Sequence, residues 1–338
     1  MVGYTAATER TERTEHGSGR AWEIQLVVLS EARMPRCADA PSSISIAMSV
    51  ITGTTQLLGV IGDPVEHSLS PLMQNAAITK IGVDFVYLPF PVKAENLETA
   101  IAGLYAIGVR GFNVTIPHKQ TIIPFLSEWS NIAQSVGAVN TVWRTEKGWY
   151  GTNTDVEGFL APLLAQKQNW QETEAVILGN GGAARAVVAG CSQLKCRKIH
   201  VIGRHWEKLQ QFQQSWQTAT TPVEIEVHLW EELPDLLPQT GLLVNTTPIG
   251  MGSNADASPV EATQMQWLPA GAIAYDLIYT PRPTKFLQTA NSHGIATIDG
   301  LEMLVQQGAS ALRRWLQQDV PVTTMRETLQ EHLATKNL

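Results

Sequence analysis

Hydroxyl, amide and amine side chains gather at predicted strand ends and loops in the first half of the chain. Neutral donors and acceptors of this kind suit a polyhydroxylated carboxylate, because hydroxyls can bond hydroxyls. One lysine, Lys119, is available for charge or proton transfer. None of these groups is a metal-ligand or nucleophile cluster. The set consists of Ser68, Ser70, Asn113, Thr115, Lys119, Asn140, Thr141, Asn153 and Asp155.

The spacing of these residues also allows simpler roles. Lys119 follows a proline at a predicted helix start, so it could be a surface lysine. Asp155 opens a predicted helix and could be only its N-cap. Ser68 and Ser70 could form a turn and an N-cap before Pro71. Spacing alone therefore leaves the catalytic and the structural interpretations open.

A glycine-rich turn after a buried strand predicts a dinucleotide site. Residues 175–178 form a short apolar run, and Gly179-Asn180-Gly181-Gly182-Ala183-Ala184 follows as G-x-G-x-x-A before a helix-permissive stretch. In such a motif Gly179 allows the tight turn, Gly181 lets the backbone approach a pyrophosphate, and Ala184 keeps the helix close to the sheet. The unpaired N–H groups at the helix N-terminus attract an anion. Glycine turns also end strands for steric reasons, so the prediction depends on the flanking strand and the alternating elements that follow.

The next predicted strand indicates which dinucleotide is bound. It covers residues 198–202 and ends at Gly203-Arg204-His205, roughly 20 residues beyond the glycine turn, where this fold binds the adenosine ribose. NAD sites usually place a carboxylate there, and no Asp or Glu is present. An arginine accommodates a 2′-phosphate through charge-assisted bonds. We therefore predict NADP, with Arg204 as its main contact and Lys208 as a helper, the alternative being a solvated arginine at a strand end.

Two α/β units are needed to position these residues. The fold class expected is an N-terminal α/β substrate domain plus a C-terminal Rossmann-type domain with a parallel NADP-binding sheet, and a cleft between them. In the first unit a polar loop is expected over residues 131–137. The other expected elements of that unit are strands near 57–61, 85–90, 111–115, 138–144 and 149–151, and helices near 70–80 and 97–107. In the second unit strands are expected at 175–179, 198–202, 223–228, 242–246, 272–276 and 295–298.

The chain is expected to divide into five parts. Residues 1–47 look unlike the rest and fit neither a signal nor a transit peptide, so we expect a disordered or non-native extension, with Met48 as a plausible start. Residues 48–154 form the substrate-binding catalytic domain, 155–173 a connector helix and linker, 174–300 the Rossmann domain, and 301–338 helices that pack back on the first domain.

Composition narrows the class of protein. The chain has 338 residues, 44% of them hydrophobic and 16% charged, which is material for about two globular domains. A net charge of −7 argues against nucleic acid or an anionic membrane as partner. Three cysteines without a C-x-x-C pair, and no histidines at ligand spacing, predict reduced thiols in a cytoplasmic protein and no metal site. No apolar run approaches the roughly 20 residues of a membrane span.

Several motifs in order closely resemble shikimate dehydrogenase, over roughly residues 57–335. In the first half they begin with Gly62-Asp63-Pro64 and His67-Ser68-Leu69-Ser70-Pro71. Asn113-Val114-Thr115-Ile116-Pro117-His118-Lys119, Gly137-Ala138-Val139-Asn140-Thr141 and Gly151-Thr152-Asn153-Thr154-Asp155 follow. In the second half they are the glycine turn, residues 245–251, residues 275–279 and residues 300–307. Any one of these could occur by chance, whereas all of them in sequence are highly specific.

The resemblance implies reversible, NADP-dependent reduction of 3-dehydroshikimate to shikimate, a step of chorismate and aromatic amino-acid biosynthesis. It places the catalytic pair on Lys119 and Asp155. It places the substrate contacts on Ser68, Ser70, Thr115, Lys119, Asn140, Asp155, Tyr279 and Gln307. It places the cofactor contacts on Gly179, Asn180, Gly181, Gly182, Ala183, Ala184, Arg204, Thr247, Leu277 and Gly300, with Lys208 added from the argument above.

One departure from the family pattern concerns the cofactor. The family often has Asn-Arg-Thr or Asn-Arg-Ser after the second strand, where this chain has Gly203-Arg204-His205. The arginine is kept, so NADP is still expected, while the detailed phosphate contacts and the strength of the preference stay open. A quinate/shikimate dehydrogenase that uses NAD and a non-catalytic NADP-binding sensor are the alternatives. The partner expected is a small molecule, and the oligomeric state is left open, with a homodimer as one candidate.

Overall fold

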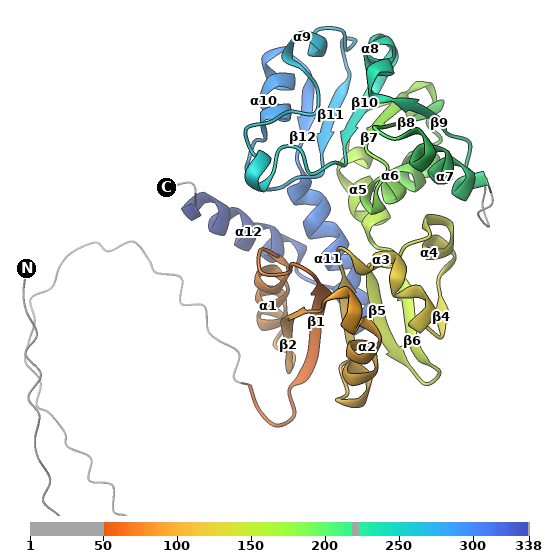
Figure 1. The fold of residues 1–338 in the computed structure, drawn as a ribbon. Coiled ribbons are helices and arrows are strands. Elements are labelled where there is room, and N and C mark those ends of the chain that lie inside the picture. The colour runs from red at the N-terminus through yellow and green to blue at the C-terminus, as the bar shows by residue number, and fades with distance from the viewer. Residues whose placement is uncertain (1–50, 218–222, 337–338) are drawn as a thin grey trace, which may run out of the picture. The chain divides into compact units, whose positions relative to one another are not determined.

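The computed structural model describes residues 51–217 and 223–336. The extension predicted over residues 1–47 lies outside the described residues. Within them the chain builds two six-stranded sheets, one from each half of the sequence. Figure 1 shows the first sheet with the strands from β1 to β6 and the second with the strands from β7 to β12, each with helices packed on it. The two-domain α/β fold predicted from the sequence is confirmed.

The first sheet is mixed, and its strand directions matter for the site. Its order is β2-β1-β3-β5-β6-β4, with β5 antiparallel to both β3 and β6. Strands β3 and β6 therefore run in the same direction, and their C-terminal ends lie at the same edge as the start of β5. The strands are β1 (Gln56–Gly62), β2 (Phe85–Pro91), β3 (Gly111–Val114), β4 (Glu128–Trp129), β5 (Thr141–Thr145) and β6 (Gly148–Thr152).

Local sequence signals set the ends of the first helix. It begins at Ser70 with Pro71 in its first turn, where the missing N–H costs nothing. It ends at Gly82, whose φ of 79° lets its N–H donate back to the carbonyls of Ile78 and Thr79. The helices of this half are α1 (Ser70–Ile81), α2 (Leu97–Ala106), α3 (His118–Thr121) and α4 (Asn131–Val136), with 3₁₀ turns at Ala94–Asn96 and Ile123–Phe125.

The loop expected over residues 131–137 is wrong, because this segment is the helix α4. The Ser130 hydroxyl accepts a hydrogen bond from the Ala133 N–H, and Gly137 closes the helix with a φ of 65°. Ala133 is buried in an apolar cluster of the first domain, and Val136 is buried in a cluster that includes residues of the second sheet. A helix this short presents too few apolar positions for its periodicity to show in the sequence.

The second sheet is parallel throughout, with the order β12-β11-β10-β7-β8-β9. Both faces are covered: Ala175 and Ile177 of β7 belong to one apolar cluster, and Val176 and Leu178 belong to the other. Strand order reverses between β7 and β10, the place where ligands bind in such sheets. The strands are β7 (Glu174–Leu178), β8 (Lys198–Gly203), β9 (Glu226–Leu229), β10 (Thr240–Asn245), β11 (Ile273–Asp276) and β12 (Ala296–Ile298).

Helices cover both faces of the second sheet. They are α6 (Gly182–Gln193), α7 (Trp206–Gln217), α8 (Leu233–Leu236), α9 (Ala262–Met265) and α10 (Lys285–Ser292). In the described part of this half, 3₁₀ turns also lie at Trp170–Glu172, Trp230–Glu232, Leu237–Gln239 and Gly252–Asn254. Among the helices that the structure describes, none has the length and apolar character to cross a membrane.

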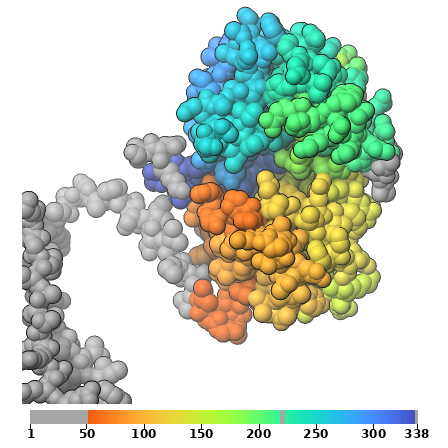
Figure 2. All heavy atoms as spheres, viewed as in Figure 1, coloured from red at the N-terminus to blue at the C-terminus, as the bar shows by residue number. Residues whose placement is uncertain are grey.

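Three helices link the two halves. Helix α5 (Asp155–Leu164) packs on α11 (Gly300–Leu316), so closely that the Gly158 position lies against the Met303 carbonyl. Apolar residues of α11 and of α12 (Val322–Lys336) share one core with β1 and α1. In the space-filling view, blue C-terminal atoms are visible where the orange first half meets the green and cyan second half (Figure 2). The C-terminal helices thus complete the core of the first domain.

Candidate active site

Lys119 and Asp155 form an ion pair at the edge of the first sheet. Lys119 lies on α3, just after β3, and Asp155 is the first residue of α5, just after β6. Because β3 and β6 end at the same edge, the two side chains meet, with Nζ 2.6 Å from Oδ2. The lysine side chain is 21% exposed and the aspartate 10%. The pair is held at a surface that opens onto a cavity, rather than in bulk solvent.

Asn140 fixes the second oxygen of the aspartate. It precedes β5, which starts at the same edge, and its Nδ2 donates to Asp155 Oδ1 at 2.7 Å. Its Oδ1 accepts from the Thr154 N–H at 2.7 Å and from the Thr141 hydroxyl. The Asn113 amide donates to the Asn140 carbonyl. Each carboxylate oxygen of Asp155 therefore has one side-chain partner, and the geometry of the pair is set by buried hydrogen bonds.

A cavity of about 230 Å³ lies in front of this pair and is lined from both halves of the chain. All eight side chains predicted to contact substrate line it, together with three of the predicted cofactor residues. These are Ser68, Ser70, Thr115, Lys119, Asn140, Asp155, Tyr279 and Gln307 on the one hand, and Ala183, Leu277 and Gly300 on the other. The cavity joins the ion pair to the C-terminal edge of the parallel sheet, so the predicted catalytic pair and three of the predicted cofactor residues share one space.

Five further residues line the cavity that the sequence did not single out as ligands. They are Val60, Asn113, Val114, Met303 and Leu304. Asn113 stands among the polar groups noted from the sequence, but as part of a cluster rather than as a contact. Met303 and Leu304 lie on α11, whose apolar periodicity predicts only core packing. Their approach to the cavity follows from the tertiary packing of α11 on α5.

Burial raises the pKa of both Tyr279 and Asp276, with different consequences for the site. Burial raises the pKa of the Tyr279 phenol, so it stays a neutral hydroxyl that can donate a hydrogen bond into the cavity. Asp276 is fully buried at the end of β11, and burial raises the pKa of its carboxyl to about 6. Hydrogen bonds from Thr284, Ile278 and Asn245 oppose this shift. Asp276 thereby ties the ends of β10 and β11 together behind the cavity.

The predicted cofactor residues collect along one edge of the parallel sheet. Gly179 follows β7 with a φ of 105°, and Thr247 follows β10 on the other side of the strand-order reversal. A Cβ on Gly179 would lie 2.8 Å from the Thr246 hydroxyl, so only glycine fits this turn. Asn180, Ala183 and Ala184 continue from the turn into α6, while Leu277 and Gly300 reach the cavity itself.

The turn before α6 has room for a phosphate group. At Gly181 and Gly182 an added Cβ would meet no atom within 4 Å, and both residues are exposed. No side chain caps the helix, so the N–H groups of its first turn are free to bind an anion. The residues therefore fit the pyrophosphate of a dinucleotide.

Arg204 and Lys208 lie apart from the cavity, at the end of β8 and on α7. Both side chains are exposed, and neither forms an ion pair with any residue in the described ranges. Arg204 follows directly after β8, beside the strand that carries the glycine turn. This is the location at which the fold binds the adenosine ribose, so the guanidinium is free for a 2′-phosphate.

Comparison with known proteins identifies the family to which the chain is similar. The model of the shikimate dehydrogenase substrate binding domain matches residues 60–142, and that of the shikimate 5′-dehydrogenase C-terminal domain matches residues 300–330. The shikimate dehydrogenase (NADP(+)) of Gloeothece citriformis is 61% identical over 286 residues, which are 85% of this chain and 99% of that protein.

Solved structures show the same likeness. A shikimate dehydrogenase in complex with NADP+ is 35% identical, with a TM-score of 0.79, over 85% of this chain and 99% of its own. The shikimate 5-dehydrogenase of Thermus thermophilus, in complex with NADP(H) and shikimate, is 31% identical, with a TM-score of 0.72, over 82% of this chain and 99% of its own. With identity this high along nearly the whole length of a relative, the chain belongs to the family of NADP-dependent shikimate dehydrogenases.

Proposed function

We propose that this chain catalyses the reversible reduction of 3-dehydroshikimate to shikimate with NADPH, using Lys119 as the acid–base group and Asp155 as its partner. The observation that carries the proposal is the Lys119–Asp155 pair, with its nitrogen and oxygen 2.6 Å apart, on a cavity shared with the nucleotide edge. The family supports the substrate and the cofactor. The reaction is a step in chorismate and aromatic amino-acid biosynthesis.

The side chains in the cavity suit this reaction. NADPH, when bound, supplies the hydride that reduces the ketone carbon. The Lys119 ammonium stabilises negative charge on the ketone oxygen and gives it a proton from Nζ. In the reverse direction Nζ takes the proton back from the hydroxyl. Asp155 keeps the lysine pointed at the cavity, and Asn140 keeps Asp155 in place. The low exposure of the pair limits competition from water.

The remaining lining residues would hold the substrate. Hydroxyls of Ser68, Ser70, Thr115 and Tyr279 and the amide of Gln307 offer donors and acceptors for a carboxylate and three oxygen substituents on a ring, beside Asn140, whose amide also holds Asp155. The cofactor would lie along Gly179, Asn180, Gly181, Gly182, Ala183, Ala184, Thr247, Leu277 and Gly300, with its 2′-phosphate on Arg204 and Lys208. We assign the substrate to residues 48–154, the link to 155–173, the cofactor to 174–300 and the closing helices to 301–338.

The test is an initial-rate assay of NADP+ reduction with shikimate, run beside NAD+ and beside quinate. Turnover with shikimate and NADP+, and little with the other pairs, is expected. Turnover mainly with quinate and NAD+ would instead assign a quinate dehydrogenase. If no pair of substrate and cofactor gave turnover while NADPH still bound, the chain would be a non-catalytic NADP-binding protein.

A further inference from the structure

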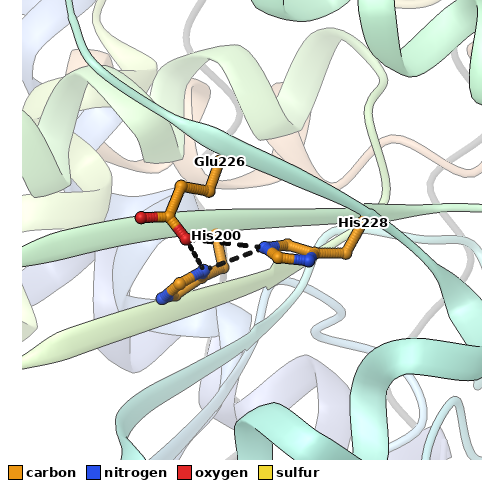
Figure 3. Close-up of side chains that lie close together, drawn as sticks. All are labelled: His200, Glu226 and His228. Atoms are coloured by element: carbon orange, nitrogen blue, oxygen red, sulfur yellow. Dashed lines mark hydrogen bonds and ion pairs between the residues drawn. The ribbon is translucent and has the colours of Figure 1, made fainter.

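Two histidines and a glutamate converge on the far edge of the parallel sheet, away from the residues that line the active-site cavity. His200 lies on β8, and Glu226 and His228 lie on the edge strand β9 (Figure 3). His200 pairs directly with Glu226, and residues two apart on a strand share a face, so all three side chains project from the same side of the sheet. His200 and His228 are 28 residues apart in the chain, and only strand pairing brings them together.

The three facing atoms have the spacing of metal ligands. His200 Nδ1 lies 3.1 Å from His228 Nε2 and 3.4 Å from Glu226 Oε2, and the latter two atoms are 3.9 Å apart. Ligands bound tetrahedrally to zinc at 2.0–2.1 Å are separated by roughly 3.3 Å. Small side-chain rotations would therefore place all three atoms around one ion. Two imidazoles and a carboxylate are also a ligand set that zinc accepts.

Each histidine has a carboxylate behind its other ring nitrogen. His200 Nε2 faces Glu174 Oε2 at 3.7 Å, and His228 Nδ1 faces Glu232 Oε2 at 3.3 Å. Carboxylates in this position favour the proton on the rear nitrogen and leave the front nitrogen as an acceptor. With both rear nitrogens protonated, the front of the cluster would hold two nitrogen lone pairs and a carboxylate oxygen within 3.9 Å of one another. A cation bound between these three atoms would be coordinated by all of them.

The surroundings are built to hold this arrangement. His200 is 2% exposed, and the Glu174 side chain is 4% exposed and held by Arg197 at 2.6 Å. Glu232 also accepts from the Leu229 N–H at 2.8 Å, and Lys198 contacts the other oxygen of Glu226 at 3.1 Å. Three carboxylates therefore face two cationic side chains around two imidazoles. The net charge of these side chains is therefore negative, which favours the binding of a divalent cation.

We propose that His200, Glu226 and His228 bind a zinc ion that ties the edge strand β9 to β8, with the fourth ligand position open to water. Glu226 is 48% exposed, which gives the ion a path from solvent. Glu174 and Glu232 act as positioning residues that orient the two imidazoles. The site is independent of the dehydrogenase reaction, since none of its residues lines the active-site cavity. Its expected effect is on stability, because an ion that binds only the folded chain shifts unfolding by mass action.

Zinc titration of the chelator-treated full chain tests the proposal. Calorimetry is expected to show one zinc per chain, and zinc should raise the unfolding temperature. His228→Gln and Glu226→Gln are each expected to weaken zinc binding about ten-fold or more, and Glu174→Gln by about 10- to 100-fold, the usual effect of losing a carboxylate behind a ligand. His332→Gln, at a histidine on α12, is the matched control and should bind like the wild type. Cobalt substitution should give the absorption of a tetrahedral site.

Two results would overturn the assignment. One is a wild-type chain that shows no zinc-dependent rise in unfolding temperature, which would mean that a shared proton alone joins the two imidazoles. The other is equal zinc affinity in the wild type and in His228→Gln, which would place the ion elsewhere. Turnover of shikimate by His228→Gln should match the wild type, so loss of zinc binding can be separated from failure of the proposed dehydrogenase activity.

Discussion

The Lys119 ammonium is held at the cavity because its anionic partner, Asp155, is itself restrained. Asp155 Oδ2 holds the lysine, while Asp155 Oδ1 is held by Asn140. A lysine without this restraint would sample many rotamers, and only a fraction of them would point at a bound ketone. The pair therefore supplies orientation as well as charge, which distinguishes it from a surface ion pair of little consequence.

Lys119→Ala removes the proposed proton donor. Turnover is expected to fall by about 10²-fold or more, the usual contribution of general acid–base catalysis, while KM for shikimate changes little. Steady-state kinetics in both directions measures this. Lys80→Ala, at an exposed lysine on α1, is the control and should behave as the wild type. A Lys119→Ala enzyme with an almost unchanged kcat would exclude the lysine from the mechanism.

Arg204→Asp tests the proposed contact with the 2′-phosphate. A guanidinium that binds the phosphate contributes roughly 1.5–3 kcal/mol, so its loss should reduce the preference for NADPH over NADH about 10- to 150-fold. Ratios of kcat/KM for the two cofactors give the preference directly. Arg313→Asp, at an exposed arginine on α11, controls for the change of charge. An unchanged preference would show that another group binds the phosphate.

At the scale of elements, the sequence predicts structure well wherever one signal dominates. The apolar run that ends at the glycine turn predicts β7, and the proline and glycine around residues 70–82 delimit α1. It fails at α4, whose helical turns are specified by capping rather than by periodicity. It also gives no indication of β4, a two-residue strand that exists only through its pairing with β6. Short elements depend on tertiary contacts that a local pattern does not contain.

Gly158→Ala tests how closely α5 and α11 must pack. A Cβ at this position would lie 2.7 Å from the Met303 carbonyl, a backbone atom that cannot move without shifting α11. Unfolding free energy from urea titration is expected to fall by about 1–3 kcal/mol, the usual cost of overpacking. KM for shikimate should rise as well, because Met303, Leu304 and Gln307 on α11 line the cavity.

Gly103→Ala is the matched control, because it also replaces a glycine inside a helix. A Cβ at Gly103 would meet no atom within 4 Å, so this variant should gain roughly 0.5–1 kcal/mol from helix propensity. The two substitutions are thus expected to change stability in opposite directions. If Gly158→Ala were as stable as Gly103→Ala, α11 would be free to shift away from α5.

At the scale of the whole molecule, the sequence predicts two domains and the place where they meet, but not the clusters that strand register creates. The residues of the proposed active site come from ordered motifs that identify the family, and all eight predicted substrate contacts line one cavity. His200, Glu226 and His228 belong to no such motif. A slip of one residue between β8 and β9 would turn Glu226 and His228 to the opposite face of the sheet, and nothing local fixes that register.

Global stability should depend on pH through Asp276. Its pKa is about 6 in the folded chain, against an ordinary value of 3.8, because burial disfavours the carboxylate. The folded state therefore keeps a proton that the unfolded state releases between about pH 4 and pH 6. A raised pKa of this kind contributes stability that is complete below the ordinary value and is lost as pH rises through 6. The difference between the two pKa values corresponds to about 3 kcal/mol of unfolding free energy.

Asp276→Asn isolates this contribution, because the amide keeps the shape of the protonated acid and does not titrate. Its oxygen can still accept from Ile278 and Asn245, and its nitrogen can donate to the Thr284 hydroxyl. The unfolding free energy of the wild type minus that of the variant should decrease by about 3 kcal/mol between about pH 3 and pH 7, and then stay level. Asp319→Asn, at an exposed carboxylate, controls for the lost charge. A difference that increased with pH would mean that hydrogen bonds from Thr284, Ile278 and Asn245 outweigh burial, and that Asp276 is ionised in the folded protein well below pH 6.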